Sequence, residues 1–390
     1  MPKRFCITGT CIPDKNYMVD ISGRIDMIIH DYIECGQYFT INRARQFGKT
    51  TTLYMLEQRL KEQYIVISLS FEAVDEYFAS LGTLAEGLVM DIAECLVEQN
   101  VAENIISEWN EPLSEKFPMR SLGIKITNLC KNCDKKVVLM IDEVDKSSDN
   151  QIFLSFLGLL REKYLKCQHG KDVTFQSVIL AGVYDVKTLK VKLHPQDETK
   201  YNSPWNIAVD FMVDMSFYVD DIKSMLLEYE NEHNTGMNIV EISSMIFDYT
   251  SGYPYLVSRI CQLIDERVAV NSGKRNETEA WTKEGVLQAV KILLKEPNTL
   301  FDDMTKKLLD HHTLKDMLQK ILFDGVDFPF KRENPVINLG VTFGFLKDKN
   351  GIVAVSNRIF ETQLYDTFLS EMAINEKLDY NGKKILEVVV

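Results

Sequence analysis

The stretch that decides the fold is Tyr38-Phe-Thr-Ile-Asn-Arg-Ala-Arg-Gln-Phe-Gly-Lys-Thr-Thr-Thr52. Its first part, Tyr38–Asn42, is a short apolar run that predicts a buried strand. The chain then turns through Gly48-Lys49-Thr50 and continues over 51–62 with leucines at helical spacing, which predicts a helix. The stretch therefore predicts a strand, a glycine-containing loop and a helix in direct succession.

This loop carries the groups that a nucleoside triphosphate requires: backbone N–H donors, the positive end of a helix, an ammonium group and a magnesium ligand. Gly48 lets the backbone approach the phosphates, Lys49 would reach the β- and γ-phosphates, and Thr50 would give its hydroxyl to Mg²⁺. The helix that opens at Thr51 supplies its dipole. The usual pattern G-x-x-x-x-G-K-[ST] has glycine where this chain has Arg43. On this loop alone, a plain glycine turn into an amphipathic helix is therefore the alternative.

A second motif, Lys136-Val-Val-Leu-Met-Ile-Asp-Glu-Val-Asp145, follows farther along the chain. Because Val138–Ile141 is wholly apolar, Asp142 and Glu143 would stand at the carboxyl end of a strand, where ligands bind in open α/β sheets. Asp142 would hold Mg²⁺, directly or through water, and Glu143 would orient and polarise the attacking water. Two acids that begin a helix are the simpler alternative, with Asp145 also suited to a first helical turn. The two motifs together predict ATP or GTP binding.

Composition sets the broad class of the protein. The chain has 390 residues, of which 45% are apolar and 26% charged, and its net charge is −13. This length favours two or three domains, and the acidic balance disfavours a general nucleic-acid coat. No run approaches the ~18 apolar residues of a membrane span, and the start lacks a secretory signal, so we expect a cytoplasmic protein without membrane contact. Cys130 and Cys133 form one C-x-x-C without the second pair that a zinc site would want.

Strands alternate with helices along the first 215 residues, which predicts an α/β fold with a parallel sheet flanked by helices. The later segments lack this alternation and read as helices from Asp220 to about Leu293, typical of an all-α lid domain. Two further helices and the hairpin pattern of Gly344–Val355 resemble a winged helix. The predicted domains are a P-loop ATPase core (1–215), a helical lid (216–296), a winged-helix-like domain (297–375) and a tail (376–390). The expected strands after the first are Tyr64–Phe71, Val137–Ile141, Gln176–Val183 and Trp205–Phe211.

The segment Phe39–Thr50 resembles the loop of the AAA-like ATPase families of bacteria, in which a basic, glycine-poor run such as Arg-Pro-Arg-Arg-Phe-Gly-Lys contains the lysine. This resemblance makes the glycine missing at Arg43 less damaging. It also implies that Arg45, Gln46 and Phe47 belong to the nucleotide site.

The resemblance extends to the signal-transducing (STAND) branch of the AAA-type ATPases. Tyr17–Arg24 is similar to a segment near the adenine, which implies nucleotide contacts for Gly23 and Arg24. Thr250–Leu256 resembles the Gly-x-Pro motif of the helical domain, which implies a nucleotide contact for Pro254. Val178–Tyr184 looks like the fourth strand, and Val355–Phe360 resembles the end of the winged helix, with Arg358 where proline is usual.

Two assignments rest on weaker signals. Arg161, on the helix after the acidic motif, or Arg259, on the helix after the Gly-x-Pro motif, could serve as an arginine finger, although each also suits a helix surface. Tyr184 or Asp185 could sense the γ-phosphate. The six histidines show no metal spacing.

Two functional hypotheses from different classes remain open. The first is a switch that binds ATP with Mg²⁺, hydrolyses it slowly and clamps its helical and winged-helix domains against the sheet. The alternative is a nucleotide-stabilised regulator that binds DNA through the winged helix. The basic residues available for it are diluted by acids: Lys331, Arg332, Lys347, Lys349 and Arg358. A metabolic kinase is disfavoured by the domains after the sheet. An unidentified protein partner is expected, a homo-oligomer is compatible with the sequence, and the biological process is not encoded in it.

Overall fold

The computed structural model describes residues 2–147, 151–184, 204–271 and 274–378. The chain divides into two compact units. The sheet unit comprises Thr8–Ile12 and Asp20–Met215, and the helical unit comprises Met1–Ile7, Pro13–Val19 and Ser216–Val390. This division differs from the expected 1–215 core in one respect, because two short N-terminal segments group with the helical unit.

The sheet unit is built on a four-stranded parallel sheet in the order β3-β6-β5-β4. Because every strand is parallel, all carboxyl ends meet at one edge, where the phosphate loop and the acidic motif both begin. The central strand β6 separates the strand before the loop from the strand before the acids. The strands are β3 (Phe39–Asn42), β4 (Ile65–Ser70), β5 (Val137–Asp142) and β6 (Ser177–Gly182).

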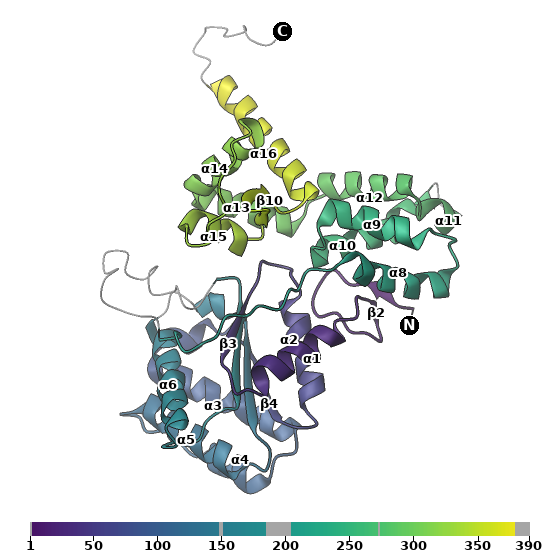
Figure 1. Cartoon of the computed structure of the whole chain (residues 1–390). Coiled ribbons are helices and arrows are strands. Elements are labelled where there is room, and N and C mark those ends of the chain that lie inside the picture. Colours follow the sequence, from purple (N-terminus) through teal and green to yellow (C-terminus); the bar gives the residue numbers. More distant parts are fainter. Residues whose placement is uncertain (1, 148–150, 185–203, 272–273, 379–390) are drawn as a thin grey trace. The chain divides into compact units, whose positions relative to one another are not determined.

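Helices cover both faces of this sheet (Figure 1). Every residue of β5 and β6 is buried, which explains why both strands read as unbroken apolar runs in the sequence. These strands and the helices predicted between them are confirmed. No helix in the described part of the chain is long and apolar enough to cross a membrane. One face carries α1 (Ser22–Ile28) and α2 (Lys49–Leu60), and the other carries α3 (Leu81–Glu98), α5 (Pro118–Asn132) and α6 (Gln151–Gln168), with α4 (Glu103–Trp109) beside α3 and α5.

The predicted final strand, Trp205–Phe211, is wrong. The segment makes a turn over 204–207 and then a single parallel bridge, between Val209 and Phe39 of β3. Beyond that bridge, side chains replace the strand ladder as hydrogen-bond partners. The Arg43 guanidinium donates to the Val213 carbonyl (2.9 Å), and the amide of Met212 donates to the Tyr32 hydroxyl (2.9 Å).

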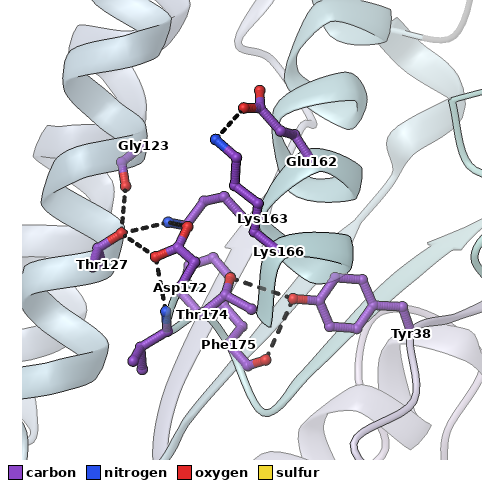
Figure 2. A network of polar contacts seen from close by, with 10 residues as sticks. Tyr38, Gly123, Thr127, Glu162, Lys163, Lys166, Asp172, Thr174 and Phe175 are labelled. Atoms are coloured by element: carbon purple, nitrogen blue, oxygen red, sulfur yellow. Dashed lines mark hydrogen bonds and ion pairs between the residues drawn. The ribbon is translucent and has the colours of Figure 1, made fainter. Parts of the chain in front are cut away.

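A largely buried ion pair lies near the amino end of β6, at the end of the sheet opposite the phosphate loop (Figure 2). Lys163 of α6 donates to Asp172 (2.9 Å) and to the hydroxyl of Thr127 on α5 (2.6 Å), and that hydroxyl donates to Asp172 (2.8 Å). The three side chains thus join two helices to the segment that leads into β6. Buried charges require this kind of complete pairing.

The helical unit contains the predicted helices. The helix-only prediction from Asp220 to about Leu293 missed one short antiparallel pair, β7 (Val270–Asn271) with β8 (Lys274–Arg275). In the N-terminal segments of this unit, β1 (Arg4–Phe5) pairs in parallel with β2 (Asn16–Tyr17). Phe5 packs on Tyr17 and Tyr229, with ring centroids 5.2 and 5.3 Å apart, which places the N-terminal segments in this unit. The helices are α8 (Val219–His233), α9 (Ile239–Thr250), α10 (Pro254–Leu263), which continues as a π-helical turn to Val268, α11 (Glu277–Ala280) and α12 (Lys283–Lys295).

The remainder of the helical unit contains the predicted hairpin. Asn350 and Gly351, at its tip, have φ values of 55° and 83°, the left-handed pair that a two-residue hairpin turn requires. The hairpin is confirmed. The sequence analysis missed α15, whose amides are capped by Asn334 (2.9 Å to the Val336 amide). The elements are α13 (Thr299–Asp310), α14 (His312–Phe323), α15 (Pro335–Thr342), β9 (Leu346–Lys349), β10 (Ile352–Val355) and α16 (Arg358–Leu378).

Candidate nucleotide-binding site

The loop between β3 and α2 has the backbone of an anion-binding turn. Gln46 and Gly48 both lie in the left-handed region, with φ values of 56° and 83°. Left-handed residues within such a turn direct successive amides to one side and form a concave anion site. Gly48 is also the N-cap of α2, and it has no side chain to cap the first amides of that helix. A phosphate is a natural partner for those amides.

The Lys49 side chain reaches back to the beginning of this loop. It is buried, and its ammonium donates to the carbonyls of Arg43 and Ala44, both at 3.1 Å. The charge is thereby held over the concave turn, where the terminal phosphates of a nucleotide would lie. The phosphate-binding role of the lysine stays a prediction.

Thr50 and Asp142 meet at the carboxyl edge of the sheet. The Thr50 hydroxyl donates to Asp142 Oδ2 at 2.6 Å, while Oδ1 accepts from the amide of Glu143 at 2.9 Å. Asp142 is buried, and Thr50 is exposed. The sequence predicted that these two side chains share one site, and the structure brings them together.

This pair of oxygen ligands fits Mg²⁺. Among the described residues, no cluster of three or more His, Cys, Asp or Glu side chains could hold a metal by itself. Mg²⁺ usually binds through one or two carboxylates together with substrate phosphates, so a hydroxyl and one carboxylate beside a phosphate loop form a suitable donor set.

Glu143 follows β5 in a strained backbone conformation. Its φ is +56°, which a residue with a side chain adopts rarely and which costs about 1–3 kcal/mol when the surroundings impose it. Strain of this kind clusters at functional sites. Glu143 directly follows the carboxyl end of β5, and its water-polarising role stays a prediction.

Asp145 is a member of the site that the sequence analysis assigned only to a helical turn. Burial raises the pKa of its carboxyl, against the opposing effect of the Lys49 charge and of hydrogen bonds from the amides of Val183 and Tyr184. Its Oδ1 accepts from the Val183 amide at 2.6 Å. Gly182 makes room for it, because a Cβ at that position would lie 1.9 Å from Oδ1. The sequence feature that could have indicated this contact is Gly182, the glycine that ends β6.

The remaining candidates of the sheet unit lie in different surroundings. Thr51 is buried, and its hydroxyl accepts from the amide of Cys11 at 3.1 Å, so its side chain has a structural partner. Arg45 is exposed in the loop, with Gln46 and Phe47 half-buried beside it. Gly23 and Arg24 lie in the first turn of α1, which packs on α2.

Arg161 is poorly placed to act on its own nucleotide. Helix α6 connects the carboxyl end of β5 to the start of β6 and so runs away from the phosphate loop. Arg161 lies ten residues after the first residue of α6, about 15 Å along the axis at 1.5 Å per residue. Its role as an arginine finger remains a prediction, which would then concern the nucleotide of a neighbouring subunit. In the helical unit, Arg259 forms a two-pronged ion pair with Glu296 (2.7 and 2.6 Å), which occupies its guanidinium.

The other predicted residues belong to the helical unit or lie outside the described residues. Pro254 is the first residue of α10 in the helical unit, and its nucleotide contact stays a prediction. Asp185 lies outside the described residues. Two of the basic residues considered for DNA binding have internal partners: Lys347 donates to the Ser251 hydroxyl (2.9 Å), and the Arg358 guanidinium lies 5.9 Å from the centre of the Tyr249 ring.

A parallel sheet with a lysine-bearing loop after one strand and paired acids after another defines an AAA-like P-loop ATPase. The chain belongs to the AAA-like domain family, whose model matches residues 19–315. A comparison with curated proteins finds no match.

Two solved structures resemble nearly the whole chain. The Walker-type ATPase of Pyrococcus abyssi has a TM-score of 0.58 at 13% identity, and the match covers 93% of this chain and 99% of that one. The Aeropyrum pernix ORC2 protein, solved in ADPNP–ADP complexes, has a TM-score of 0.52 at 12% identity, covering 92% and 98%. At these identities the likeness establishes the fold.

Proposed function

We propose that this protein is a Mg²⁺-dependent switch that binds ATP and hydrolyses it slowly, and that nucleotide state sets the arrangement of its domains. The observation that carries the proposal is the contact between Thr50 and Asp142 beside the buried ammonium of Lys49. Three groups suited to one nucleotide–metal complex thus meet at the carboxyl edge of a parallel sheet. Membership of the AAA-like family supports nucleotide binding as their common purpose.

Each side chain then has a chemical task. Lys49 would place a positive charge against the β- and γ-phosphates, and the first amides of α2 would bind their oxygens. Thr50 and Asp142 would hold Mg²⁺, which offsets phosphate charge when bound. Glu143 would accept a hydrogen bond from the attacking water and orient it in line with the γ-phosphate.

The switch role rests on the resemblance to the STAND branch. Gly23 is exposed in the first turn of α1, with nothing within 4 Å of an added Cβ, so its backbone is open to solvent and to a ligand. Pro254 opens α10, whose N-terminus could bind an anion. The helices α13–α15 followed by the hairpin β9–β10 are compatible with a winged-helix module. Under this proposal, nucleotide state would set the arrangement of the domains, as in other P-loop switches.

Two substitutions test the proposal. Lys49→Ala should abolish ATP binding, because the loop loses its only ammonium over the phosphates. Glu143→Gln should keep binding but lower turnover by about 10²–10⁴-fold, the usual contribution of a general base. Lys61→Ala is a matched control, because Lys61 lies at the other end of α2 and pairs with Glu57.

Binding is measured by titration calorimetry and turnover by phosphate release, both with Mg²⁺. Equal binding and turnover in all four proteins would overturn the proposal. Loss of both activities in the Lys61→Ala variant would show that the assay reports folding and not the site.

A further inference from the structure

Arg43 stands where most phosphate loops have glycine, and its side chain does not project into the loop. Its Nη1 donates to the Asn42 carbonyl at 3.0 Å, and its Nη2 donates to the carbonyls of Val213 at 2.9 Å and Phe211 at 3.5 Å. The guanidinium carbon also lies 5.2 Å from the centre of the Phe211 ring. The side chain is therefore bound to a segment about 170 residues away in sequence.

The main chain of the same residue belongs to the nucleotide site. The Arg43 carbonyl accepts from the Lys49 ammonium at 3.1 Å. Its amide donates to the carbonyl of Gly182, at the end of β6, at 3.2 Å. One residue thus joins the phosphate-binding lysine, the central strand and a distant segment.

That segment, residues 209–215, is here named the strap. Phe211, Val213 and Met215 are buried, while the residues between them are exposed. The strap is bridged to β3 at Val209, and Phe211 stacks on Phe39 of that strand with centroids 5.7 Å apart. The chain leaves the sheet unit directly after the strap, between Met215 and Ser216. The strap is therefore the last part of the sheet unit before the chain enters the helical unit.

We propose that Arg43 is a positioning residue that couples nucleotide occupancy of the phosphate loop to the strap. This inference rests on the proposed function. A bound phosphate competes for the Lys49 ammonium, which donates to the Arg43 and Ala44 carbonyls in this structure. A change in that hydrogen bond shifts the Arg43 main chain, and the guanidinium carries the shift to Phe211 and Val213.

The chemistry of arginine suits this task. A planar guanidinium can donate to several carbonyls at once while its face lies on an aromatic ring, and it stays charged at every physiological pH. A lysine donates from a single nitrogen at the end of a flexible stem and has no flat face. Glycine, the usual residue, would leave the strap carbonyls without this donor. Arg43 has a negative φ, so the loop itself does not demand glycine at this position.

Hydrogen exchange tests the coupling on the full chain. Amide exchange over residues 209–215 is measured with and without Mg²⁺ and saturating imido-bridged ATP analogue, with saturation checked by calorimetry on the same samples. In the wild-type protein the analogue should slow exchange in the strap several-fold. In Arg43→Gln, which loses the guanidinium, bound analogue should leave strap exchange unchanged.

Two further variants make the result specific. Arg43→Lys keeps the positive charge but lacks the planar fork that reaches the Asn42, Phe211 and Val213 carbonyls while lying on the Phe211 ring. It should therefore lose the nucleotide effect as Arg43→Gln does, and it serves if Arg43→Gln does not fold. Arg59→Gln changes an exposed arginine of α2 and should retain the full effect.

Each outcome decides the question. A wild-type protein that binds the analogue without slower strap exchange overturns the coupling alone, as does an Arg43→Gln protein that keeps the nucleotide effect. An Arg43→Gln protein that no longer binds the analogue would make Arg43 a binding residue and overturn the coupling role. Absence of binding in the wild-type protein would overturn the proposed function together with this inference.

Discussion

The Thr50 hydroxyl and the Asp142 carboxylate, 92 residues apart in the chain, are joined by a hydrogen bond of 2.6 Å. Strand β3, which precedes the loop, is not a neighbour of β5, which ends at Asp142, because β6 lies between them. Thr50 is the second residue of α2, directly after the loop. From this position its side chain reaches across the carboxyl end of β6 to Asp142. Loop and acids therefore form one site at the sheet edge.

Replacing Thr50 with alanine should weaken the Mg²⁺ dependence of nucleotide binding. The hydroxyl is one of the two side-chain groups proposed to hold the ion, and losing even a group that only orients metal ligands lowers metal affinity by about 10- to 100-fold. Titration of ATP at several Mg²⁺ concentrations measures the change. Thr50→Ser keeps the hydroxyl and should behave as wild type. Identical Mg²⁺ dependence in Thr50→Ala would remove the residue from the metal site.

Gly182→Ala should destabilise the sheet unit and lower ATP turnover. The added Cβ would lie 1.9 Å from Asp145 Oδ1 and 3.1 Å from a methyl of Val144, so the segment after the acidic motif must shift. Overpacking of this kind costs about 1–3 kcal/mol. Thermal unfolding and phosphate release measure both effects.

The control for this clash is Gly158→Ala, in the middle of α6. An added Cβ there meets nothing within 4 Å, and alanine favours a helix over glycine by about 0.5–1 kcal/mol. The control should therefore raise the melting temperature. A Gly182→Ala protein as stable as wild type would show that the Asp145 side chain can adopt another position without loss of stability.

The local parts of the fold could be predicted because each depended on residues close together in sequence. The apolar runs of β5 and β6 predicted buried strands, and Asn350-Gly351 predicted the hairpin turn. The strand order β3-β6-β5-β4 depends on pairings between distant segments, and nothing local specifies it. The same holds for Asp145, whose burial depends on Gly182.

The failed strand at Trp205–Phe211 shows a different limit. In that segment the buried residues are Trp205, Ala208 and Phe211, a spacing of three and not the alternation of a strand. Farther on, the side chains of Arg43 and Tyr32 bind the carbonyls of Phe211 and Val213 and the amide of Met212. An apolar composition indicates burial, but it does not show whether a neighbouring strand or side chains complete the backbone hydrogen bonds. Helix α15 was missed because its valines, isoleucine and Gly340 have weak helix propensity.

Lys163→Met should destabilise the sheet unit strongly. It would leave the Asp172 carboxylate of Figure 2 without its cation. Removing one partner of a fully buried ion pair costs about 3–5 kcal/mol, and the loss here should approach the lower end because Asp172 is half-buried. Lys166→Met is the matched control, because Lys166 lies on the same helix and pairs with Glu162 in solvent. That pair should contribute less than about 1 kcal/mol. Denaturant unfolding compares the two, and equal losses would contradict the burial argument.

The same ion pair should give stability a defined pH dependence. Burial alone would raise the pKa of Asp172, but hydrogen bonds from Lys163, Thr127 and the Val173 amide outweigh it and hold the pKa below 3.8. The ionised carboxylate therefore stabilises the fold above the unfolded-state pKa, and this contribution is lost as pH falls through the lowered folded-state value. The stability difference between wild type and Asp172→Asn should shrink below about pH 4. A difference that grows in acid would reverse the assignment.

Gly252→Ala should damage the helical unit through two separate effects. Gly252 has a φ of +73°, and an added Cβ would lie 1.8 Å from the Phe217 carbonyl oxygen. The same two residues are joined by a hydrogen bond, from the Phe217 amide to the Gly252 carbonyl at 2.8 Å. The methyl group would therefore force apart the chain segments that meet before α10.

Gly236→Ala separates these effects, because Gly236 has nearly the same φ, +76°, with nothing within 4 Å of an added Cβ. It should lose only the left-handed preference, about 1–2 kcal/mol. Gly252→Ala should lose more than this, and amides 216–218 should exchange faster in that variant alone. Equal melting temperatures for the two variants would mean that the contact between Phe217 and Gly252 yields without loss. The turn before Pro254 would then be held by its backbone preference and not by packing.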